Sequence, residues 1–168
     1  AIDDDVNFGT GDFSVEFWVN FSDLASNESG MMSKDTYAGD VGNLRGWLFN
    51  RCDACGSVMD QVGTGGVGFE TRQRSGGIGP WVHARVPASQ FVVGRWYHLA
   101  GVRQSNVLTL YVDGTARVSV QEPTPVHVST HAPITLGALT AGSRQFMGGL
   151  LDEVAIYSRA LTPSEVLA

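Results

Sequence analysis

Apolar side chains recur at every second position through residues 13–21. The odd-numbered positions of this segment are all Phe or Val, and the even-numbered positions are Ser14, Glu16, Trp18 and Asn20. Successive side chains of a β-strand point to opposite faces, whereas a helix repeats its apolar residues every three or four positions. The segment is therefore predicted to be a strand with one face in a hydrophobic core and one face of mixed character.

Shorter segments of the same kind follow at close intervals. The further predicted strands are residues 6–8, 30–33, 47–50, 67–71, 81–86, 96–103, 107–112, 116–120, 134–137 and 150–157. No long helical periodicity separates them, and 21 glycines among 168 residues supply many turn positions. Many short strands joined by turns favour an all-β sandwich or barrel.

Two local motifs predict a hairpin and a short helix. Asp113-Gly114 lies between two apolar runs, and this dipeptide suits the type I′ turn, in which both central residues need positive φ. Residues 162–165 (TPSE) combine an N-cap residue, a proline at the first helical position and a glutamate three residues after the cap. We therefore expect residues 107–112 and 116–120 to pair antiparallel, and a helix of one or two turns to close the domain.

Three stretches, taken in order, carry a family signature. They are residues 13–19 (FSVEFWV), the pair 94–102 and 108–114 (GRWYHLAGV and LTLYVDG), and residues 148–165, which include LLDEVAIYSRAL. The first resembles the first core strand of laminin-G-like domains, the second their central hairpin, and the third their closing strand and helix. The resemblance covers nearly the whole chain. It implies a concanavalin A-like jelly roll, a two-sheet antiparallel sandwich with a short C-terminal helix. We expect residues 1–168 to form one such domain, excised from a larger protein.

Charge and hydropathy exclude two classes of partner. The net charge is -6, and Lys34 is the only lysine among the 11 basic residues. Binding to nucleic acid would need a basic patch, and the sequence contains none. No run of 18 apolar residues is present, so a membrane span is not expected. The excess of acidic residues fits solubility and a hard cation.

Asp152 is the first candidate metal ligand. In a regular strand it would share a face with the apolar residues at 150, 154 and 156, which we expect to point inward. An inward carboxylate needs a partner, because an unpaired buried charge is costly. Domains that this chain resembles often hold Ca²⁺ between this region and the N-terminal segment, which here carries Asp3, Asp4 and Asp5. The resemblance implies a structural calcium site; the alternative is a solvated N-terminal segment and an Asp152–arginine contact.

Cys52 and Cys55 are the only cysteines, in a C-x-x-C spacing. A redox motif would need a βαβ context, which the pattern does not supply. Zinc would need two more ligands, and His127 and His131 lie about 13 Å apart on an extended chain. A local disulfide formed in an oxidising compartment is the favoured interpretation.

A candidate ligand site combines aromatic and basic side chains. Sugars are recognised by aromatic faces together with hydrogen bonds to hydroxyls, and arginine forks suit carboxylates, so an acidic sugar is a candidate ligand. The residues proposed to contact a glycan are Arg72, Arg74, Trp81, His83, Tyr37 and Trp47. The alternative is an ordinary polar strand face with a core tryptophan. Trp18 and Trp96 are expected to pack in or against the core, because large aromatic side chains are highly buried on average.

Sequence motifs for catalysis are missing. Glycoside hydrolases of this fold need two facing carboxylates, whereas Glu16, Glu70 and Glu153 are isolated in sequence. The Glu-x-Asp-x-x-Glu and Gln-x-His motifs of the hydrolase and lyase branches are absent.

The expected role is therefore a non-catalytic, lectin-like carbohydrate-binding module. We expect it to belong to a secreted or cell-surface multidomain protein and to be stabilised by calcium, with a polysaccharide or glycan and other domains of the same chain as partners. The alternatives are a protein-interaction or adhesion module, and third a polysaccharide lyase or glycoside hydrolase.

Overall fold

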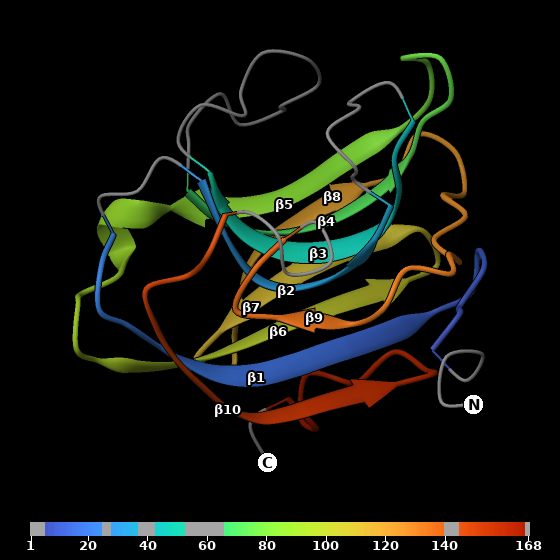
Figure 1. Ribbon diagram of the computed structural model, residues 1–168. Helices are drawn as coiled ribbons and strands as arrows, with labels where there is room; N and C mark the ends of the chain where they lie inside the picture. The colour runs from blue at the N-terminus through green and yellow to red at the C-terminus, as the bar shows by residue number, and fades with distance from the viewer. Residues whose placement is uncertain (1–5, 25–27, 37–42, 53–65, 140–144, 167–168) are drawn as a thin grey trace.

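The protein is a sandwich of two five-stranded β-sheets. We describe it from a computed structural model, which places residues 6–24, 28–36, 43–52, 66–139 and 145–166. Sheet A has the strand order β10-β1-β6-β7-β8, and sheet B has the order β5-β4-β3-β2-β9. Figure 1 shows the two sheets stacked face to face, and neighbouring strands within each sheet are antiparallel. The expected two-layer all-β fold is confirmed.

The strands match the predicted segments closely. Their bounds are Phe13–Phe21 (β1), Glu28–Asp35 (β2), Arg45–Cys52 (β3), Gly66–Gln73 (β4), Trp81–Pro87 (β5), Trp96–Gln104 (β6), Val107–Val112 (β7), Thr115–Gln121 (β8), Thr135–Leu136 (β9) and Gly149–Tyr157 (β10). A 3-10 turn, η1, spans Ala88–Gln90. The strand expected at residues 6–8 is wrong, because these residues form a turn and irregular backbone.

Aromatic residues from both sheets meet in the core. Phe17 of β1 makes an edge contact with Phe49 of β3, with ring centroids 4.9 Å apart, and Phe49 stacks on Phe69 of β4 at 4.9 Å. Gly101 of β6 lies opposite these rings, where an added Cβ would come within 2.5 Å of Phe69. A side chain at this point would push the sheets apart, so glycine permits their close approach.

Two tight turns organise the β6-β7-β8 meander. Asp113 and Gly114 both have positive φ (49° and 69°) between β7 and β8, which confirms the predicted hairpin. Ser105 and Asn106 also have positive φ (49° and 64°) between β6 and β7. This turn joins the two strands of the central hairpin that the family resemblance implies, although neither residue is glycine.

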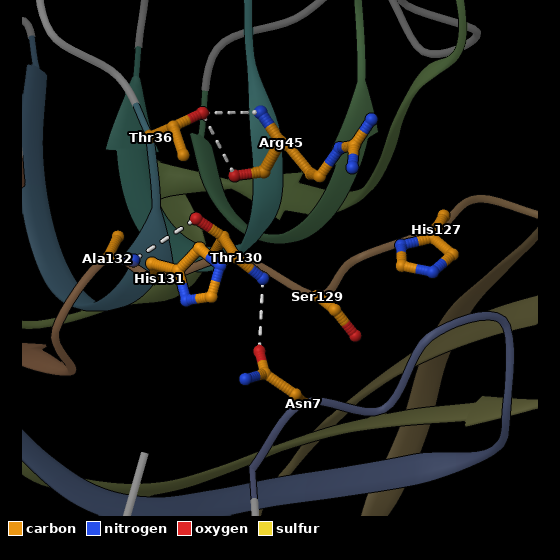
Figure 2. Close-up of a pocket in the computed structure, with 8 residues that line it drawn as sticks. All are labelled: Asn7, Thr36, Arg45, His127, Ser129, Thr130, His131 and Ala132. Atoms are coloured by element: carbon orange, nitrogen blue, oxygen red, sulfur yellow. Dashed lines mark hydrogen bonds between the residues drawn. The ribbon is translucent and has the colours of Figure 1, made fainter. Parts of the chain in front are cut away.

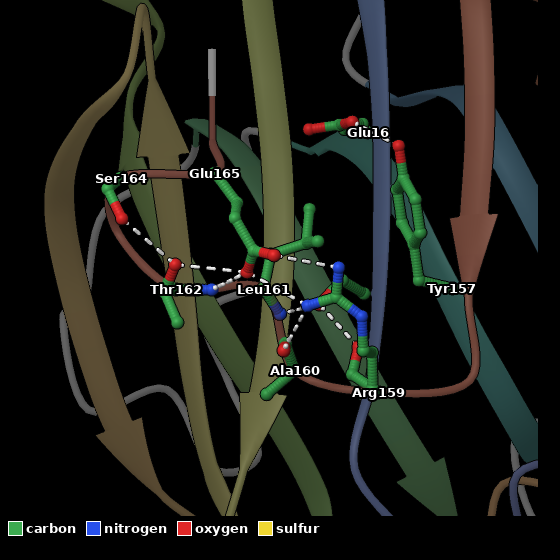
Figure 3. A network of polar contacts seen from close by, with 9 residues as sticks. Glu16, Tyr157, Arg159, Ala160, Leu161, Thr162, Ser164 and Glu165 are labelled. Carbon is green, nitrogen blue, oxygen red and sulfur yellow. Dashed lines mark hydrogen bonds and ion pairs between the residues drawn. The ribbon is translucent and has the colours of Figure 1, made fainter. Parts of the chain in front are cut away.

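The described residues after β10 (158–166) form a turn and no helix, which corrects the predicted C-terminal helix. The capping contact itself is present, since Thr162 donates from its backbone N–H to Glu165 Oε2 (2.8 Å). Glu165 also pairs with both terminal nitrogens of Arg159, at 2.8 Å each, as Figure 3 shows. A single turn fixes many dihedral angles for few backbone bonds, so here side-chain contacts hold the turn and no helix propagates within the described residues.

This C-terminal segment packs on the outer face of sheet A. Leu161 and Val166 form a second, small hydrophobic cluster with Ala100 and Val102 of β6 and Tyr111 of β7. Ser14 of β1 anchors the segment, because its Oγ donates to the carbonyl of Arg159 (3.0 Å) and accepts from the N–H of Leu161 (2.8 Å). Only one end of this outer face is covered by the cluster.

Trp18 and Trp96 lie on the uncovered part of the same face. Trp18 is half-buried and Trp96 is 39% exposed, whereas their neighbours Phe17, Val19 and Tyr97 point into the core. Neither indole belongs to the core cluster, which corrects the expectation that Trp18 and Trp96 pack in or against the core. The even-numbered face of β1 carries Glu16, Trp18 and Asn20, and this face is turned away from sheet B.

Candidate functional site

A polar cluster occupies the outer face of sheet B at strands β4 and β5. The register pairs Glu70 with His83 and Arg72 with Trp81, so these four side chains lie on one face. The alternate positions of the same strands, such as Phe69, point into the core. Strict strand alternation therefore places a charged layer directly behind the hydrophobic core.

Glu70 lies at the centre of this cluster and is fully buried. It accepts a hydrogen bond from Trp81 Nε1 (2.9 Å), lies 3.0 Å from His83 Nδ1 and forms an ion pair with Arg85. Burial alone would raise the pKa of Glu70, but the charges of His83 and Arg85 and the hydrogen bonds from His83 and Trp81 lower the pKa to about 2. The carboxylate is held ionised and has a structural role.

Arg72 is also buried and pairs with Asp35 of β2 across the sheet. Loss of hydration lowers the pKa of Arg72 to about 9, while the charge of Glu28 acts in the opposite direction. The side chain still carries its charge at neutral pH. The Arg72 side chain is buried, and its guanidinium group lies over the ring of Trp81.

Trp81 joins the buried cluster to the surface. Its half-buried ring lies 5.6 Å from the guanidinium carbon of Arg72 and 5.7 Å from that of Arg74, and the ring of His83 is 5.1 Å away. Arg74 is half-buried and donates to the carbonyl of Gly77 in the β4–β5 loop. The structure thus brings together the four predicted residues Arg72, Arg74, Trp81 and His83. Trp81 and Arg74 are the two with accessible surface.

Trp47 is not part of this site, which corrects the sequence-based prediction. It points into the core from β3 and contacts Phe13, with ring centroids 6.1 Å apart. Strand β3 is buried on both faces over most of its length, so its sequence contains no alternation from which orientation could be predicted. Tyr37, the other aromatic residue proposed in this region, lies outside the described residues.

A cavity at the same end of the sandwich was not predicted. It has a volume of about 570 Å³ and is lined by Asn7, Thr36, Arg45, His127 and residues 129–132. Figure 2 shows the side chains of these segments around the opening. Thr36 Oγ1 accepts from the N–H of Arg45 (2.9 Å), and Asn7 Oδ1 accepts from the N–H of Thr130 (3.0 Å). Arg45 lies opposite Gln73 in the sheet, so the cavity adjoins the strand end that carries Arg72 and Arg74.

The lining of this end cavity is basic and hydroxylated. His127, Ser129 and His131 alternate with the buried residues Val126, Val128 and Thr130. Its described lining contains Arg45 and no carboxylate. The alternation around His127 and His131 was visible in the sequence, but the distant segments at Asn7 and Thr36 could be joined to it only by the fold.

Asp152 does not point inward, because β10 contains a β-bulge. The pairing with β1 shifts between Glu16 and Trp18, and Glu153 has a φ of 49°. Asp152 therefore lies opposite Trp18 on the outer face, where it is exposed, and its Oδ1 accepts from the N–H of Glu153 (2.9 Å).

The predicted calcium site stays a prediction. Asp3, Asp4 and Asp5 lie outside the described residues. In the part of the chain that the structure places, no three His, Cys, Asp or Glu side chains gather as a metal site would require.

The disulfide between Cys52 and Cys55 also stays a prediction. Cys52 is buried at the end of β3. Its proposed partner, Cys55, lies outside the described residues.

Comparison with known proteins gives one family match and several solved structures of similar fold. The model of the concanavalin A-like lectin/glucanases superfamily matches residues 1–167. The CBM40 of the Ruminococcus gnavus IT-sialidase, solved with α2,3-sialyllactose, shares 14% identity with a TM-score of 0.65, over 95% of this chain and 83% of that one. Domain 4 of AbnA, a GH43 extracellular arabinanase from Geobacillus stearothermophilus solved with arabinotriose, shares 23% identity with a TM-score of 0.60, over 94% and 65%.

A third structure is similar over a smaller share of its length. The K499G mutant of NanB sialidase from Streptococcus pneumoniae shares 20% identity with a TM-score of 0.67, over 93% of this chain and 23% of that one. A search of functionally curated proteins gave no significant match. The family match covers nearly every residue and agrees with the two antiparallel sheets described above. The chain belongs to the concanavalin A-like lectin/glucanase superfamily.

Proposed function

We propose that this chain is a non-catalytic carbohydrate-binding module that binds glycan at the β4–β5 end of sheet B. The observation that carries the proposal is the half-buried Trp81 ring, held by Glu70 and flanked by the guanidinium groups of Arg72 and Arg74. A fixed aromatic ring beside an accessible cation can take the C–H face of a sugar and one of its polar substituents. The carbohydrate-bound structures of similar fold support this proposal.

The charge of this end favours a glycan that carries a carboxylate. Arg45 is exposed and lines the end cavity, and the half-buried Arg74 lies beside it, since its backbone N–H donates to the carbonyl of Leu44 (2.6 Å). The described carboxylates next to Trp81 are already paired, Glu70 with Arg85 and Asp35 with Arg72. A guanidinium fork can bind a carboxylate through two hydrogen bonds, so a uronic or sialic acid fits better than a neutral sugar.

The carboxylates of sheet B do not suit glycoside hydrolysis. A catalytic acid needs a raised pKa, whereas the pKa of Glu70 is lowered to about 2. Burial raises the pKa of Glu28. However, Glu28 aligns across the sheet with Gly66, four residues from Glu70, which is about 13 Å along the strand. That spacing exceeds the roughly 5–9.5 Å that separates the two carboxyl groups in retaining or inverting enzymes.

Calcium stabilisation and an extracellular location complete the proposal. Asp152 offers an exposed carboxylate for a cation, and hard oxygen ligands suit Ca²⁺. We expect a chelator to lower the melting temperature and added Ca²⁺ to restore it, and an unchanged melting temperature would remove this part. The extracellular arabinanase domain of similar fold supports the location. None of the described residues forms a helix long and apolar enough to cross a membrane.

A glycan array followed by calorimetry tests the proposal. We expect binding to acidic oligosaccharides, and Arg74→Gln should weaken it by about tenfold, the loss expected when one charge-assisted pair worth about 1.5 kcal/mol is removed. Arg117→Gln is the matched control, because Arg117 is exposed on β8 and pairs with Gln90 instead. Failure of the isolated chain to bind any glycan would refute the proposal, and turnover of a polysaccharide would replace it with an enzyme.

A further inference from the structure

A second groove lies on the opposite side of the molecule, on the outer face of sheet A. The tryptophan groove, as we call it, is lined by Trp18, Trp96, Asp152 and Glu153 and has a volume of about 410 Å³. Trp18 pairs with His98 and Trp96 with Asn20 in the register of β1 and β6, so the two indoles are diagonal neighbours on one sheet face. The C-terminal segment covers the other end of this face and leaves the groove open.

The β-bulge in β10 shapes the acidic side of the groove. In a regular strand Asp152 and Glu153 would point to opposite faces of the sheet. The bulge at Glu153, with its positive φ, allows both carboxylates to line the same cavity beside Trp18. Positive φ is uncommon for a residue other than glycine, and such backbone concentrates at binding sites.

Glu16 is a third carboxylate on the same face of β1 as Trp18. Glu16 Oε1 accepts from the hydroxyl of Tyr157 (2.8 Å), as Figure 3 shows. Its Oε2 lies 3.5 Å from His98 Nε2 and accepts no hydrogen bond from the described residues. His98 itself is buried, and its ring lies 5.4 Å from that of Trp18.

The surrounding cations do not neutralise these carboxylates. Burial lowers the pKa of His98, against the opposing charges of Glu16, Asp113 and Glu153, so its imidazole is neutral at pH 7. Arg95 is paired with Asp113, with Nη2 and Oδ2 2.9 Å apart. Three carboxylates and two accessible indoles therefore share one face with no unmatched positive charge among the described groups that face it.

We infer that the tryptophan groove is a binding site for ligands that present an ammonium group beside an apolar or C–H-rich face, such as the free amine of an amino sugar. An indole face attracts a cation through its quadrupole, and the carboxylates of Asp152 and Glu153 add Coulomb attraction. The groove is distinct in position and charge from the glycan site on sheet B, so this inference does not depend on glycan binding there.

Calorimetric titration with small ammonium compounds tests the inference. The probes are glucosamine and choline, and N-acetylglucosamine serves as the uncharged match for glucosamine. We expect the two cations to bind with a Kd of about 0.1–10 mM, the range of a shallow site with one ion pair and one cation–π contact, and N-acetylglucosamine not to bind. Binding of glucosamine alone would identify amino sugars as the ligand class, and binding of both cations would identify a general organic ammonium site.

Isosteric variants locate the site without disturbing the fold. Asp152→Asn and Glu153→Gln should each weaken glucosamine binding by about fivefold or more, and Trp96→Ala should abolish it. Asp12→Asn is the control, because it removes the same charge at the far end of β1 and its amide oxygen can still accept from the N–H of Ser105. Equal binding of glucosamine and N-acetylglucosamine, equal effects of Asp12→Asn and Asp152→Asn, or no binding of either cation would overturn the inference.

Discussion

On the outer face of sheet B, charged side chains are buried and form ion pairs with one another. On the outer face of sheet A, charged side chains are exposed beside two accessible tryptophans. Glu70 makes contacts with three side chains and lies below the surface. Asp152 and Glu153 are exposed and line a groove. Both faces arise from the same strand alternation, so the difference comes from what covers them. The comparison shows that polarity on a sheet face does not by itself identify a binding surface.

The two faces also differ in charge. Arg45 and Arg74 make the end of sheet B basic, while Asp152 and Glu153 make the tryptophan groove acidic. A small domain with a net charge of -6 thus presents two regions of opposite sign to solvent. Such a separation can select two kinds of ligand without competition between them.

The largest expected contrast concerns two tryptophans. Trp47→Ala should destabilise the protein by about 3–5 kcal/mol, because it leaves a large cavity in the core. Trp96→Ala should cost less than about 1 kcal/mol, because the ring is 39% exposed. Urea unfolding followed by circular dichroism measures both. Equal losses would mean that Trp96 belongs to the core after all.

The two central glutamates give the next contrast. Glu70→Gln should destabilise the fold by roughly 3 kcal/mol, because it leaves Arg85 with an uncompensated charge in a buried position. Glu16→Gln should have a much smaller effect, since Glu16 is half-buried and keeps its contact with Tyr157. Chemical unfolding of both variants would refute the buried network if Glu70→Gln proved as mild as Glu16→Gln.

Acid should remove the stability that Glu70 supplies. Its folded pKa of about 2 lies below the ordinary value of 4.5, so its contribution is complete above about pH 5 and is lost as the pH falls towards 2. The full contribution is up to roughly 3 kcal/mol, from 1.36 kcal/mol per pKa unit. Unfolding free energies measured from pH 6 to pH 2 should fall less steeply in Glu70→Gln than in the wild type. Identical slopes would contradict the lowered pKa.

The smallest expected effect concerns the covered end of sheet A. Ser14→Ala removes two hydrogen bonds to the C-terminal segment and should cost about 1–2 kcal/mol. Amide exchange of Leu161 should become faster, while exchange in β3 and β4 should change only through the global stability. Unchanged protection at Leu161 would show that the hydrophobic cluster alone holds this segment.

Residue patterns predicted the fold well where one face of a strand was polar. The alternation from Phe13 to Phe21 placed β1 correctly, and Asp113-Gly114 placed the β7–β8 turn. The proposed glycan contact of Trp47 is wrong, since β3 is buried on both faces and its sequence gives no alternation from which to orient this side chain. Strand alternation also oriented Asp152 wrongly, because a β-bulge reverses the alternation and leaves no signal in the local sequence.

The candidate sites were predictable only in part. Arg72, Arg74, Trp81 and His83 lie close together in the sequence, so a single hairpin brings them together. The tryptophan groove joins β1, β6 and β10, and the end cavity joins segments near residues 7, 36, 45 and 130. Contacts between segments so far apart in the sequence depend on the order of the strands in the sheets, which local sequence patterns do not determine.

The central claim is that acidic glycans bind at the β4–β5 end of sheet B and not in the tryptophan groove. Calorimetric titration of an acidic oligosaccharide such as sialyllactose into the wild type, Trp81→Ala and Trp96→Ala tests it most directly. We predict that Trp81→Ala weakens binding by about tenfold or more, as expected for loss of an aromatic platform worth roughly 1–2 kcal/mol, and that Trp96→Ala leaves it unchanged. The reverse result, with binding lost in Trp96→Ala and retained in Trp81→Ala, would contradict the account.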